Sequence, residues 1–505
     1  MIPAFLRWIT GHTPVIHPEN GLGWRAVGLR GLAAGLLLTA SVPPFGWWIL
    51  GLAGAALLAD TLMRVDGWRM RLLAGAATGL TLYGVGWFWM SEFSAIGYVL
   101  AVIIEIAILS LACVTVAKHR LWAVPGALVL AEYARDHFPF GGVPLAGLPL
   151  GQVGGPLAPA ARLGGQLLVV ALIGAVAVAV VAARQRRMVC AAAAVVVVLA
   201  CVLGGHVAGG THKTGDLVVA SVQGGGRRGL RAIYSDPNRV FLAQLQASAK
   251  VRAPVDLVVW PEDVIDVDQV TGSPQAEDVA RTARELNATV VAGIVEDAGP
   301  DHFANAALAW NPDGTITARY DKVHRVPYGE YIPFRGLVKH FANLDAVPRD
   351  AIAGHGPGIL KTAAGRFGVA ISYEVFFSDR ARIATRHGAE VMLVPTNASS
   401  FSTGQVPAQE LGAARLRAME TGRWVVQTAP TGYSAVVNPN GHVLAHSDLG
   451  AQDVIQRTVE RRAGQTPATR LGDGLPALVA LPAAAAALAL PRREPSEVEP
   501  VLGPA

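Results

Sequence analysis

The sequence predicts a bundle of membrane helices joined to an α/β domain, and three observations lead to this fold class. Charged residues make up only 16% of the chain, against about 25% in soluble domains, and the mean hydropathy is +0.39. Long apolar runs fill the first 210 residues. Beyond Gly215, short strand-like runs alternate with polar helical patterns, which is typical of a sheet covered by helices.

The first part of the chain is a series of apolar runs separated by short polar segments. Several runs approach the roughly 20 residues that a helix needs to cross a hydrocarbon core about 30 Å thick. A short, Ala-rich run near the C-terminus brings the prediction to about eight membrane helices. We predict helices over 26–40, 47–63, 72–89, 96–117, 121–133, 166–183, 188–206 and 475–490.

The distribution of Lys and Arg between these helices indicates how the chain is oriented. If the N-terminus is inside, each inside segment carries a basic cluster, whereas the outside loops 42–46 and 92–95 carry none. The longer outside loop, 134–165, has only two arginines. By the positive-inside rule, we expect residues 210–465 to lie outside the cytoplasm.

The formal charge of +5 is explained by these basic clusters and does not indicate nucleic-acid binding. The first 25 residues do not have the pattern of a cleaved signal peptide.

The three cysteines, Cys113, Cys190 and Cys201, all lie in apolar runs and have no metal-ligand spacing. We therefore expect buried thiols. The α/β part contains no cysteine, which excludes a disulfide or a catalytic thiol there.

The second part of the chain has the alternating pattern of an α/β domain. Buried strands are predicted over 217–223, 256–262, 289–295, 367–372, 390–396 and 424–428. Helices are predicted between them, over 237–250, 275–286, 378–387 and 407–422.

Three motifs in this part hold residues that can do chemistry. Glu262 follows an apolar run ending in Trp-Pro, and because Pro cannot continue a sheet interior, we expect Glu262 at a strand end. Lys322 and Glu330 lie in a loop rich in Pro, Gly and aromatic residues, where Lys can stabilise an oxyanion. Ser372, followed by Tyr and Glu, ends another strand-like run and can be a nucleophile. Taken singly, the motifs also fit a solvated carboxylate, a surface ion pair and a hydrogen-bonding serine.

Together the motifs resemble the nitrilase superfamily, whose Glu-Lys-Cys triad carries out acyl transfer. The joining of such a domain to membrane helices is similar to the apolipoprotein N-acyltransferase family, and the resemblance spans nearly the whole chain. It is carried by SVPPFGWWILGLA (41–53), LVLAEYARDHFPFGGVPLAGLPLGQ (128–152), KVHRVPYGEYIPFR (322–335) and AMETGRWVVQTAPTGYSAVVNPNG (418–441). The implied fold is about eight transmembrane helices with an extracytoplasmic, nitrilase-like α-β-β-α sandwich.

Carried over residue by residue, the resemblance implies that Glu262 is the general base, Lys322 the oxyanion partner, and Ser372 the residue in place of the usual cysteine. It also implies a set of supporting residues near the site. These are Glu330, Tyr373 and Glu374. No metal or soluble cofactor is implied.

The resemblance further implies a multi-pass protein of a bacterial plasma membrane. Such an enzyme takes an acyl chain from a membrane phospholipid and passes it to the N-terminal amine of a diacylglyceryl-cysteine lipoprotein. The expected division is a helical domain over 1–212, a catalytic domain over 213–462, and a C-terminal helix and cytoplasmic tail over 463–505.

A serine at the nucleophile position weakens this chemistry. A thiol has a pKa near 8.5, whereas a hydroxyl is a far weaker acid. An oxyester is also less reactive toward an amine than a thioester, so both half-reactions slow. Four possibilities stay open: a slow oxyester transferase, a catalytically impaired homologue that acts as a lipid- or partner-binding scaffold, a serine introduced to trap substrate, and a membrane-tethered amidase-type hydrolase.

A glycine-rich segment and a carboxylate in an apolar run each have both a functional and a structural explanation. Residues 224–229 spell G-x-G-x-x-G after a strand, but no clear acidic strand end follows about twenty residues later, so a loop is favoured over a dinucleotide site. Glu105 interrupts the fourth apolar run, where a carboxylate normally faces the protein interior or a cavity. It is either hydrogen-bonded structure or part of a lipid path.

Overall fold

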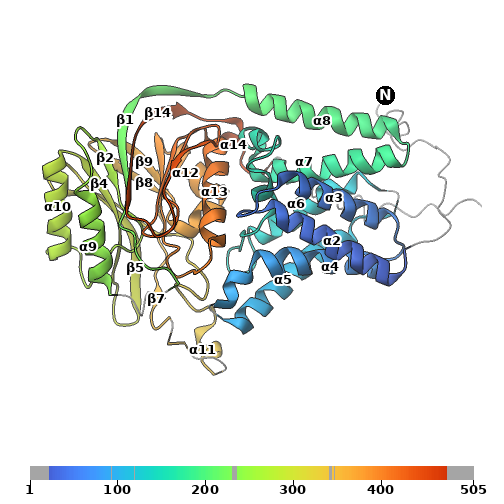
Figure 1. Ribbon diagram of the computed structural model, residues 1–505, viewed down its shortest axis with the longest axis horizontal. Helices are drawn as coiled ribbons and strands as arrows, with labels where there is room; N and C mark the ends of the chain where they lie inside the picture. The colour runs from blue at the N-terminus through green and yellow to red at the C-terminus, as the bar shows by residue number, and fades with distance from the viewer. Residues whose placement is uncertain are drawn as a thin grey trace, which may run out of the picture.

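The computed structural model describes residues 22–474, apart from 93, 119, 230–235, 341–343 and 346. A helical bundle and an α/β domain lie side by side along the long axis of the molecule (Figure 1). The predicted helix over 475–490 lies outside the described residues.

Each of the other seven predicted apolar runs overlaps a helix, although the runs 72–89, 96–117 and 121–133 extend beyond the helix ends. Three helical segments, Ala95–Val114, Ala158–Arg184 and Met188–Val207, are long and apolar enough to cross a membrane, and Trp48–Met63 is apolar but shorter. The helices of the bundle are α2 (Trp24–Ser41), α3 (Trp48–Met63), α4 (Trp68–Gly86), α5 (Ala95–Val114), α6 (Ala123–Arg135), α7 (Ala161–Arg184) and α8 (Met188–Val207). α8 buries only Ala191 and Gly205, so most of its apolar side chains face outward, as on a lipid-facing helix.

The α/β domain contains two sheets packed face to face. The first has the strand order β14-β1-β2-β4-β5-β6, with β3 paired to β4 and β7 to β5, and the second has the order β13-β12-β11-β10-β9-β8. The first sheet consists of β1 (Thr211–Gln223), β2 (Leu257–Val259), β3 (Ile265–Val267), β4 (Thr289–Asp297), β5 (His302–Trp310), β6 (Ile316–Asp321), β7 (Asp350–Ala351) and β14 (Asp453–Gly464). The second consists of β8 (Ile359–Thr362), β9 (Gly365–Val369), β10 (Val391–Pro395), β11 (Val425–Thr428), β12 (Ala435–Val437) and β13 (Val443–His446).

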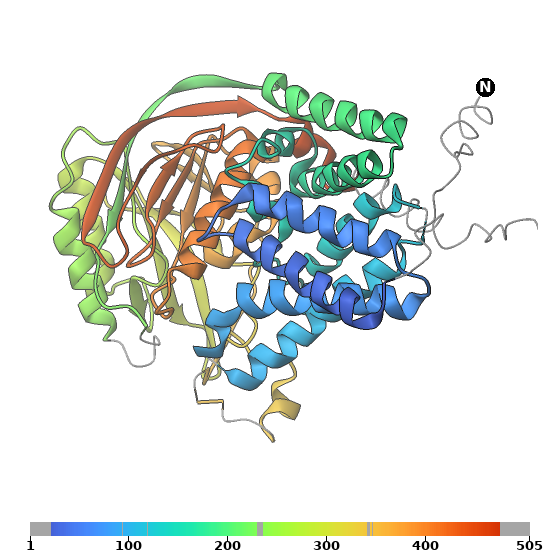
Figure 2. The same cartoon turned by 45° about the vertical axis from the view of Figure 1, so that its right-hand side comes forward.

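Helices cover the outer faces of both sheets and complete an α-β-β-α sandwich. α9 (Pro237–Ser248) and α10 (Pro274–Leu286) lie at the far end of the molecule, whereas α12 (Ser378–Arg386) and α13 (Gln405–Thr421) lie between the second sheet and the bundle (Figures 1 and 2). Two short helices, α11 (Arg335–Val338) and α14 (Pro467–Leu471), lie outside these layers. The four predicted helices of this domain are confirmed.

Alternating apolar side chains from the two sheets form the core between them, for example Val219, Val259, Phe367 and Leu393. A separate core continues from the bundle into α12 and α13. The α/β domain is therefore packed onto the helices by buried apolar contacts.

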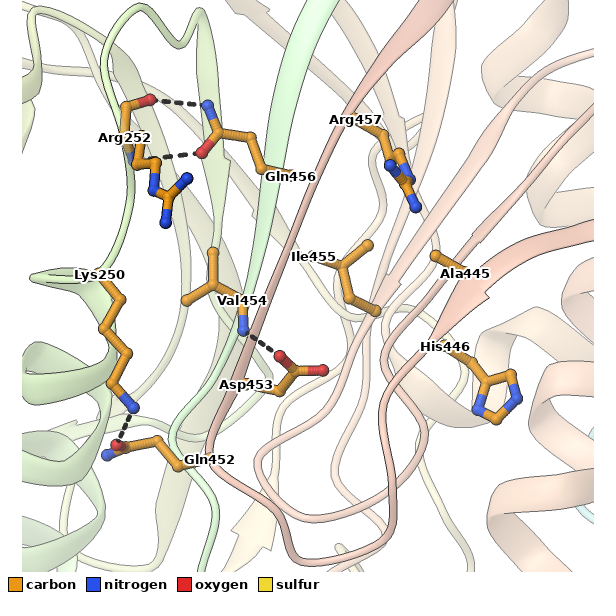
Figure 3. Close-up of a pocket in the computed structure, with 10 residues that line it drawn as sticks. All are labelled: Lys250, Arg252, Ala445, His446, Gln452, Asp453, Val454, Ile455, Gln456 and Arg457. Atoms are coloured by element: carbon orange, nitrogen blue, oxygen red, sulfur yellow. Dashed lines mark hydrogen bonds between the residues drawn. The ribbon is translucent and has the colours of Figure 1, made fainter.

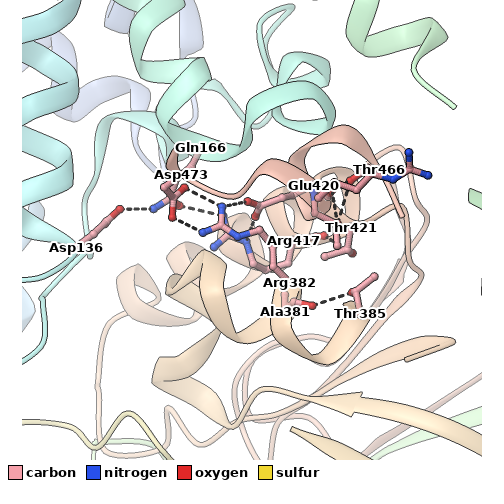
Figure 4. A network of polar contacts seen from close by, with 12 residues as sticks. Asp136, Gln166, Ala381, Arg382, Thr385, Arg417, Glu420, Thr421, Thr466 and Asp473 are labelled. Atoms are coloured by element: carbon pink, nitrogen blue, oxygen red, sulfur yellow. Dashed lines mark hydrogen bonds and ion pairs between the residues drawn. The ribbon is translucent and has the colours of Figure 1, made fainter. Parts of the chain in front are cut away.

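A buried polar network crosses this interface (Figure 4). Arg382 of α12 pairs with Glu420 of α13 at 2.9 Å and with Asp473, which follows α14. Arg417 of α13 donates to the Gln166 side chain of α7 at 2.9 Å, and Gln166 donates to Asp136 at 2.7 Å. The network therefore joins elements that are hundreds of residues apart in sequence.

The ion pair between Arg135 and Glu105 corrects the predicted position of Arg135 and decides between the two explanations of Glu105. Arg135, one of the two arginines assigned to an outside loop, instead lies in the last turn of α6, is fully buried and pairs with Glu105 of α5. Its guanidinium also contacts Glu132 at 3.0 Å. Glu105 is therefore hydrogen-bonded structure.

Strand boundaries differ from the prediction near two of the motifs. The strand expected over 256–262 is confined to β2, and the strand expected over 367–372 ends at Val369. Ser372 begins a 3-10 turn, Ser372–Phe376, with a φ of +48°. The G-x-G-x-x-G segment after β1 is a loop, as expected; its Gly225 N–H donates to the Pro430 carbonyl at 2.9 Å.

Candidate active site

The candidate residues each lie just beyond the carboxyl end of a strand. Within the first sheet, β2 and β4 are parallel, and two successive antiparallel pairings give β6 the same direction. Glu262 follows β2 and Lys322 follows β6, while Ser372 follows β9 in the second sheet. Carboxyl ends of parallel strands are where α/β proteins place their sites.

A buried cluster surrounds Lys322. Its Nζ lies 2.8 Å from Glu262 Oε1 and 2.6 Å from Glu330 Oε1. Asn305 of β5 donates to the same two oxygens, at 2.9 Å and 3.1 Å. Lys322 is 1% exposed and Glu262 is 3% exposed, so the explanations as a surface ion pair and a solvated carboxylate are wrong.

The charge of Lys322 is held by this cluster. Burial alone lowers the pKa of the ammonium, but the attraction of Glu262 and Glu330 outweighs it and raises the pKa above its ordinary value. Lys322 therefore carries a fixed positive charge suited to stabilising a developing oxyanion.

Ser372 lies in a strained turn that is held from several sides. A φ of +48° is uncommon for a residue with a Cβ, and such conformations persist where the surroundings impose them. Glu374, two residues on, accepts hydrogen bonds from the backbone N–H of Ile371 at 2.8 Å and of Val323 at 2.8 Å. Tyr373 donates its hydroxyl to the Gly142 carbonyl in the bundle at 2.8 Å. The turn is thus fixed to both the Lys322 segment and the bundle.

Glu410, which the sequence reasoning missed, contacts Ser372 directly. The Ser372 hydroxyl donates to Glu410 Oε1 at 3.2 Å, and the Thr396 hydroxyl donates to the same oxygen at 2.6 Å. Glu410 lies on α13, and Thr396 directly follows β10. Asn305 was also missed. Nothing in its strand marks it, whereas a carboxylate on a helix predicted to cover a sheet was a usable signal for Glu410.

The pKa of Glu410 is raised to about 7, first because the carboxyl is buried, and Glu262 adds to the rise. The hydrogen bonds from Thr396 and Ser372 and the charge of Lys322 act in the opposite direction. The pKa of Glu410 is therefore affected by Glu262 and Lys322 as well as by Ser372. The Lys322 cluster and the Ser372 turn lie in the same region.

Two pockets lie outside this cluster. An apolar one of about 530 Å³ lies where the α2–α3 and α4–α5 connections meet the loop before α13, and its lining includes Phe45, Leu80, Phe88, Tyr98 and Gln405. The other, of about 510 Å³, lies beside β14 and is lined by basic side chains that include Lys250, Arg252 and Arg457 (Figure 3). It contains none of the candidate site residues.

Comparison with known proteins gives the same two-part division. Residues 34–183 match the apolipoprotein N-acyltransferase N-terminal domain, and residues 218–468 match the carbon-nitrogen hydrolase family. A nitrilase-superfamily structure from Saccharomyces cerevisiae is 21% identical, with a TM-score of 0.38, and the match covers 49% of this chain and 91% of that chain.

Similarity to curated relatives extends over both parts. An apolipoprotein N-acyltransferase of Mycolicibacterium smegmatis is 30% identical over 487 residues, covering 87% of this chain and 81% of the relative. The enzyme of the same name from Azotobacter vinelandii is 29% identical over 500 residues, covering 92% and 93%. One from Pseudomonas aeruginosa is 28% identical over 482 residues, covering 87% and 91%. The chain therefore belongs to the apolipoprotein N-acyltransferase family of membrane acyltransferases.

Proposed function

We propose that this protein moves a fatty acyl chain from a membrane phospholipid to the N-terminal amine of a diacylglyceryl-cysteine lipoprotein, through an acyl-enzyme on Ser372. Family membership over most of the chain supports the reaction. The observation that carries the choice of nucleophile is the position of the Ser372 hydroxyl. It is hydrogen-bonded to a buried carboxyl, in a strained turn tied to the Lys322 segment.

The residues divide into a nucleophile, an electrophilic partner and groups that hold them. Lys322 stabilises the oxyanion of each tetrahedral intermediate. Glu330 and Asn305 fix Lys322, and Glu374 and Tyr373 fix the turn. Two buried carboxyls, Glu262 and Glu410, are available as proton acceptors. The first is the base that the family resemblance implies.

The proposed setting is a bilayer crossed by about eight helices, with the catalytic domain on the extracytoplasmic side of a bacterial plasma membrane. The division would be helices over 1–212, the catalytic domain over 213–462, and a final helix and tail over 463–505. The apolar pocket at the junction can take an acyl chain. Both substrates are lipids of one leaflet, so their encounter is two-dimensional and their orientation is partly set in advance.

The serine sets the expected rate. A hydroxyl is a weaker acid than a thiol, and its ester is a poorer acyl donor to an amine. Replacement by cysteine should therefore speed both half-reactions in an otherwise intact site, and each 1.4 kcal/mol of barrier removed is about tenfold in rate.

The test is an acyl-transfer assay on the purified full-length protein, with phospholipid carrying a labelled acyl chain and a diacylglyceryl-cysteine peptide. We expect labelled peptide with the wild type, none with Ser372→Ala, and more with Ser372→Cys. Thr315→Ala removes an exposed hydroxyl of the β5–β6 turn and should leave the rate unchanged. Label released only as free fatty acid would instead indicate a hydrolase. If neither the wild type nor Ser372→Cys transfers the acyl chain, the protein would instead be a lipid- or partner-binding scaffold.

A further inference from the structure

Arg228 is a cation close to the candidate site that has no role in the chemistry described so far. It lies in the loop after β1 and is partly buried. Its Nη2 donates to the backbone carbonyls of Phe401 at 3.0 Å and Thr403 at 2.9 Å. Its Nε is buried without a hydrogen-bond partner in the described part of the chain. A guanidinium has five N–H donors, so Arg228 retains donors for a ligand.

No carboxylate within the described residues pairs directly with Arg228. Burial lowers the pKa of its guanidinium, and the charges of Glu410 and Glu92 act in the opposite direction. Both carboxyls have other partners: Glu410 accepts from the two hydroxyls described above, and Glu92 accepts the backbone N–H of Ser402 at 3.0 Å and its hydroxyl at 2.7 Å. The positive charge of Arg228 is therefore left for an anionic group that is not part of these contacts.

Arg228 lies between the apolar pocket and the nucleophile. Thr403, whose carbonyl accepts from Arg228, lines that pocket together with the two residues that follow it. On the other side, Arg228 is within electrostatic reach of Glu410, the carboxyl that is hydrogen-bonded to Ser372. In a glycerophospholipid only a short glycerol segment separates the ester carbonyl from the phosphate. An ester at Ser372 with its acyl chain in the pocket would thus bring the phosphate toward Arg228.

The guanidinium is held in place by contacts that reach the bundle. The Gly229 N–H donates to the Ser399 carbonyl at 2.8 Å, which ties the loop after β1 to the segment before α13. The Phe401 ring in that segment packs edge-to-face on Trp89, with ring centroids 4.9 Å apart. Trp89 belongs to the 3-10 helix Phe88–Glu92, which follows α4. In the proposed membrane setting this end of α4 is extracytoplasmic, at the level of the lipid headgroups.

From this arrangement we propose that Arg228 binds the phosphate of the phospholipid donor and so positions the donor ester against Ser372. Arginine forms charge-assisted hydrogen bonds with phosphate oxygens, and its planar fork suits their geometry. The inference rests on the proposed function, because that function makes a phospholipid the donor. It deepens that function by naming the residue that distinguishes a phospholipid from an uncharged lipid ester.

The first measurement is the binding of a fluorescent phospholipid with ether-linked chains, which cannot donate an acyl group, to the full-length protein in detergent. Arg228→Gln removes the charge and keeps an amide that can donate to a carbonyl. Its Kd should rise about tenfold or more, as expected for the loss of a hydrogen bond to a charged group. Arg227→Gln, at the exposed neighbouring arginine, is the matched control and should bind as wild type does. A dialkylglycerol without phosphate should bind wild type and Arg228→Gln equally.

The second measurement is acyl-enzyme formation on Ser372, followed by mass spectrometry with increasing phospholipid and no acceptor. Arg228→Gln should raise KM about tenfold and leave the maximal rate of acylation near that of wild type, because the phosphate lies away from the reacting atoms. Arg228→Lys keeps the charge without the planar fork, and its KM should lie between the two. With diacylglycerol as donor, wild type and Arg228→Gln should be acylated alike.

Wild-type protein gives an independent check if Arg228→Gln folds poorly. Salt screens the attraction between a partly exposed cation and a phosphate. Added sodium chloride should therefore weaken the binding of the ether-linked phospholipid and leave the binding of the dialkylglycerol unchanged. The same salt response for both lipids would contradict a phosphate site.

The outcomes separate this inference from the proposed function. Equal loss of phospholipid and dialkylglycerol binding in Arg228→Gln would mean that Arg228 only holds its loop, and would overturn the inference. Inorganic phosphate that binds wild type as tightly as the ether-linked lipid would identify a free anion as the ligand, with the same result. A wild type that binds the phospholipid through Arg228 and is never acylated would instead overturn the proposed function.

Discussion

The hydroxyl of Tyr320 donates a hydrogen bond to the carboxylate of Glu374 at 2.9 Å. Tyr320 lies in β6, two residues before Lys322, and Glu374 lies two residues after Ser372. The same carboxylate accepts the backbone N–H of Val323 and of Ile371. One buried side chain therefore holds the Lys322 segment and the Ser372 segment together.

Tyr320→Phe should loosen this connection without removing a catalytic group. A hydrogen bond to a charged group contributes about 1.5–3 kcal/mol, so we expect a lower Tm in detergent and a lower acylation rate with an unchanged pH profile. Tyr433→Phe is the matched control, because the Tyr433 hydroxyl makes no hydrogen bond within the described part of the chain. Equal Tm values for the two variants would contradict this role of Glu374.

Lys322→Met should be both unstable and inactive. It leaves the buried Glu262 and the partly exposed Glu330 without their ammonium partner, and breaking a buried pair destabilises by about 3–5 kcal/mol. The double variant Lys322→Met/Glu262→Gln removes one of the stranded charges. It should regain part of the stability and none of the activity, as measured by unfolding and acyl transfer in a double-mutant cycle. Activity in the double variant would exclude Lys322 as the oxyanion partner.

Glu410 should make the folding stability depend on pH. Its pKa rises from 4.5 to about 7 on folding, so the folded state binds this proton more tightly than the unfolded state. The resulting stabilisation is fully present below pH 4.5 and is lost as the pH rises through about 7, a change of about 3 kcal/mol. Unfolding of wild type and Glu410→Gln between pH 5 and 8 should show a steeper decline for wild type. Parallel curves would refute the shift.

Arg135→Met, a substitution inside the bundle, should affect the candidate site indirectly. The guanidinium pairs with Glu105 and also donates to the Leu145 carbonyl. Next to Leu145, the Ala146 N–H donates to the Gln409 side chain at 2.9 Å. Loss of the cation leaves a buried carboxylate unpaired, at a penalty of about 3–5 kcal/mol, and frees the loop that α13 rests on. Lower Tm and slower acylation are expected, and Arg162→Met, at a partly buried arginine on α7, should have the smaller effect.

The sequence was sufficient to locate the helices of the bundle and to name the main residues of the candidate site. Apolar runs of nearly membrane length predicted the seven described helices of the bundle. A long uninterrupted run of apolar residues is a strong signal of a membrane helix. Glu262, Lys322 and Ser372 were found through the family's motifs, which keep their order along the chain. The strand before Ser372 was predicted too long, because a positive φ at a serine leaves no pattern in the sequence.

The rest depends on contacts between distant segments. Glu410 and Arg135 are charged residues that a local reading places on a covering helix and in a loop, whereas tertiary packing buries both. Their partners are 38 and 30 residues away in the sequence. Only the folded arrangement shows that each has a charged or hydroxyl group opposite it.

The chain enters the α/β domain along β1 and leaves it along β14, and these strands pair from Thr211–Gly464 to Gln223–Asp453. They run together over the upper side of the molecule and meet the bundle at one corner (Figure 2). The α/β domain therefore begins and ends at neighbouring points of the chain trace. A different domain whose ends lie equally close together can be joined to the helical bundle at this one position. The order of the preceding helices would not change.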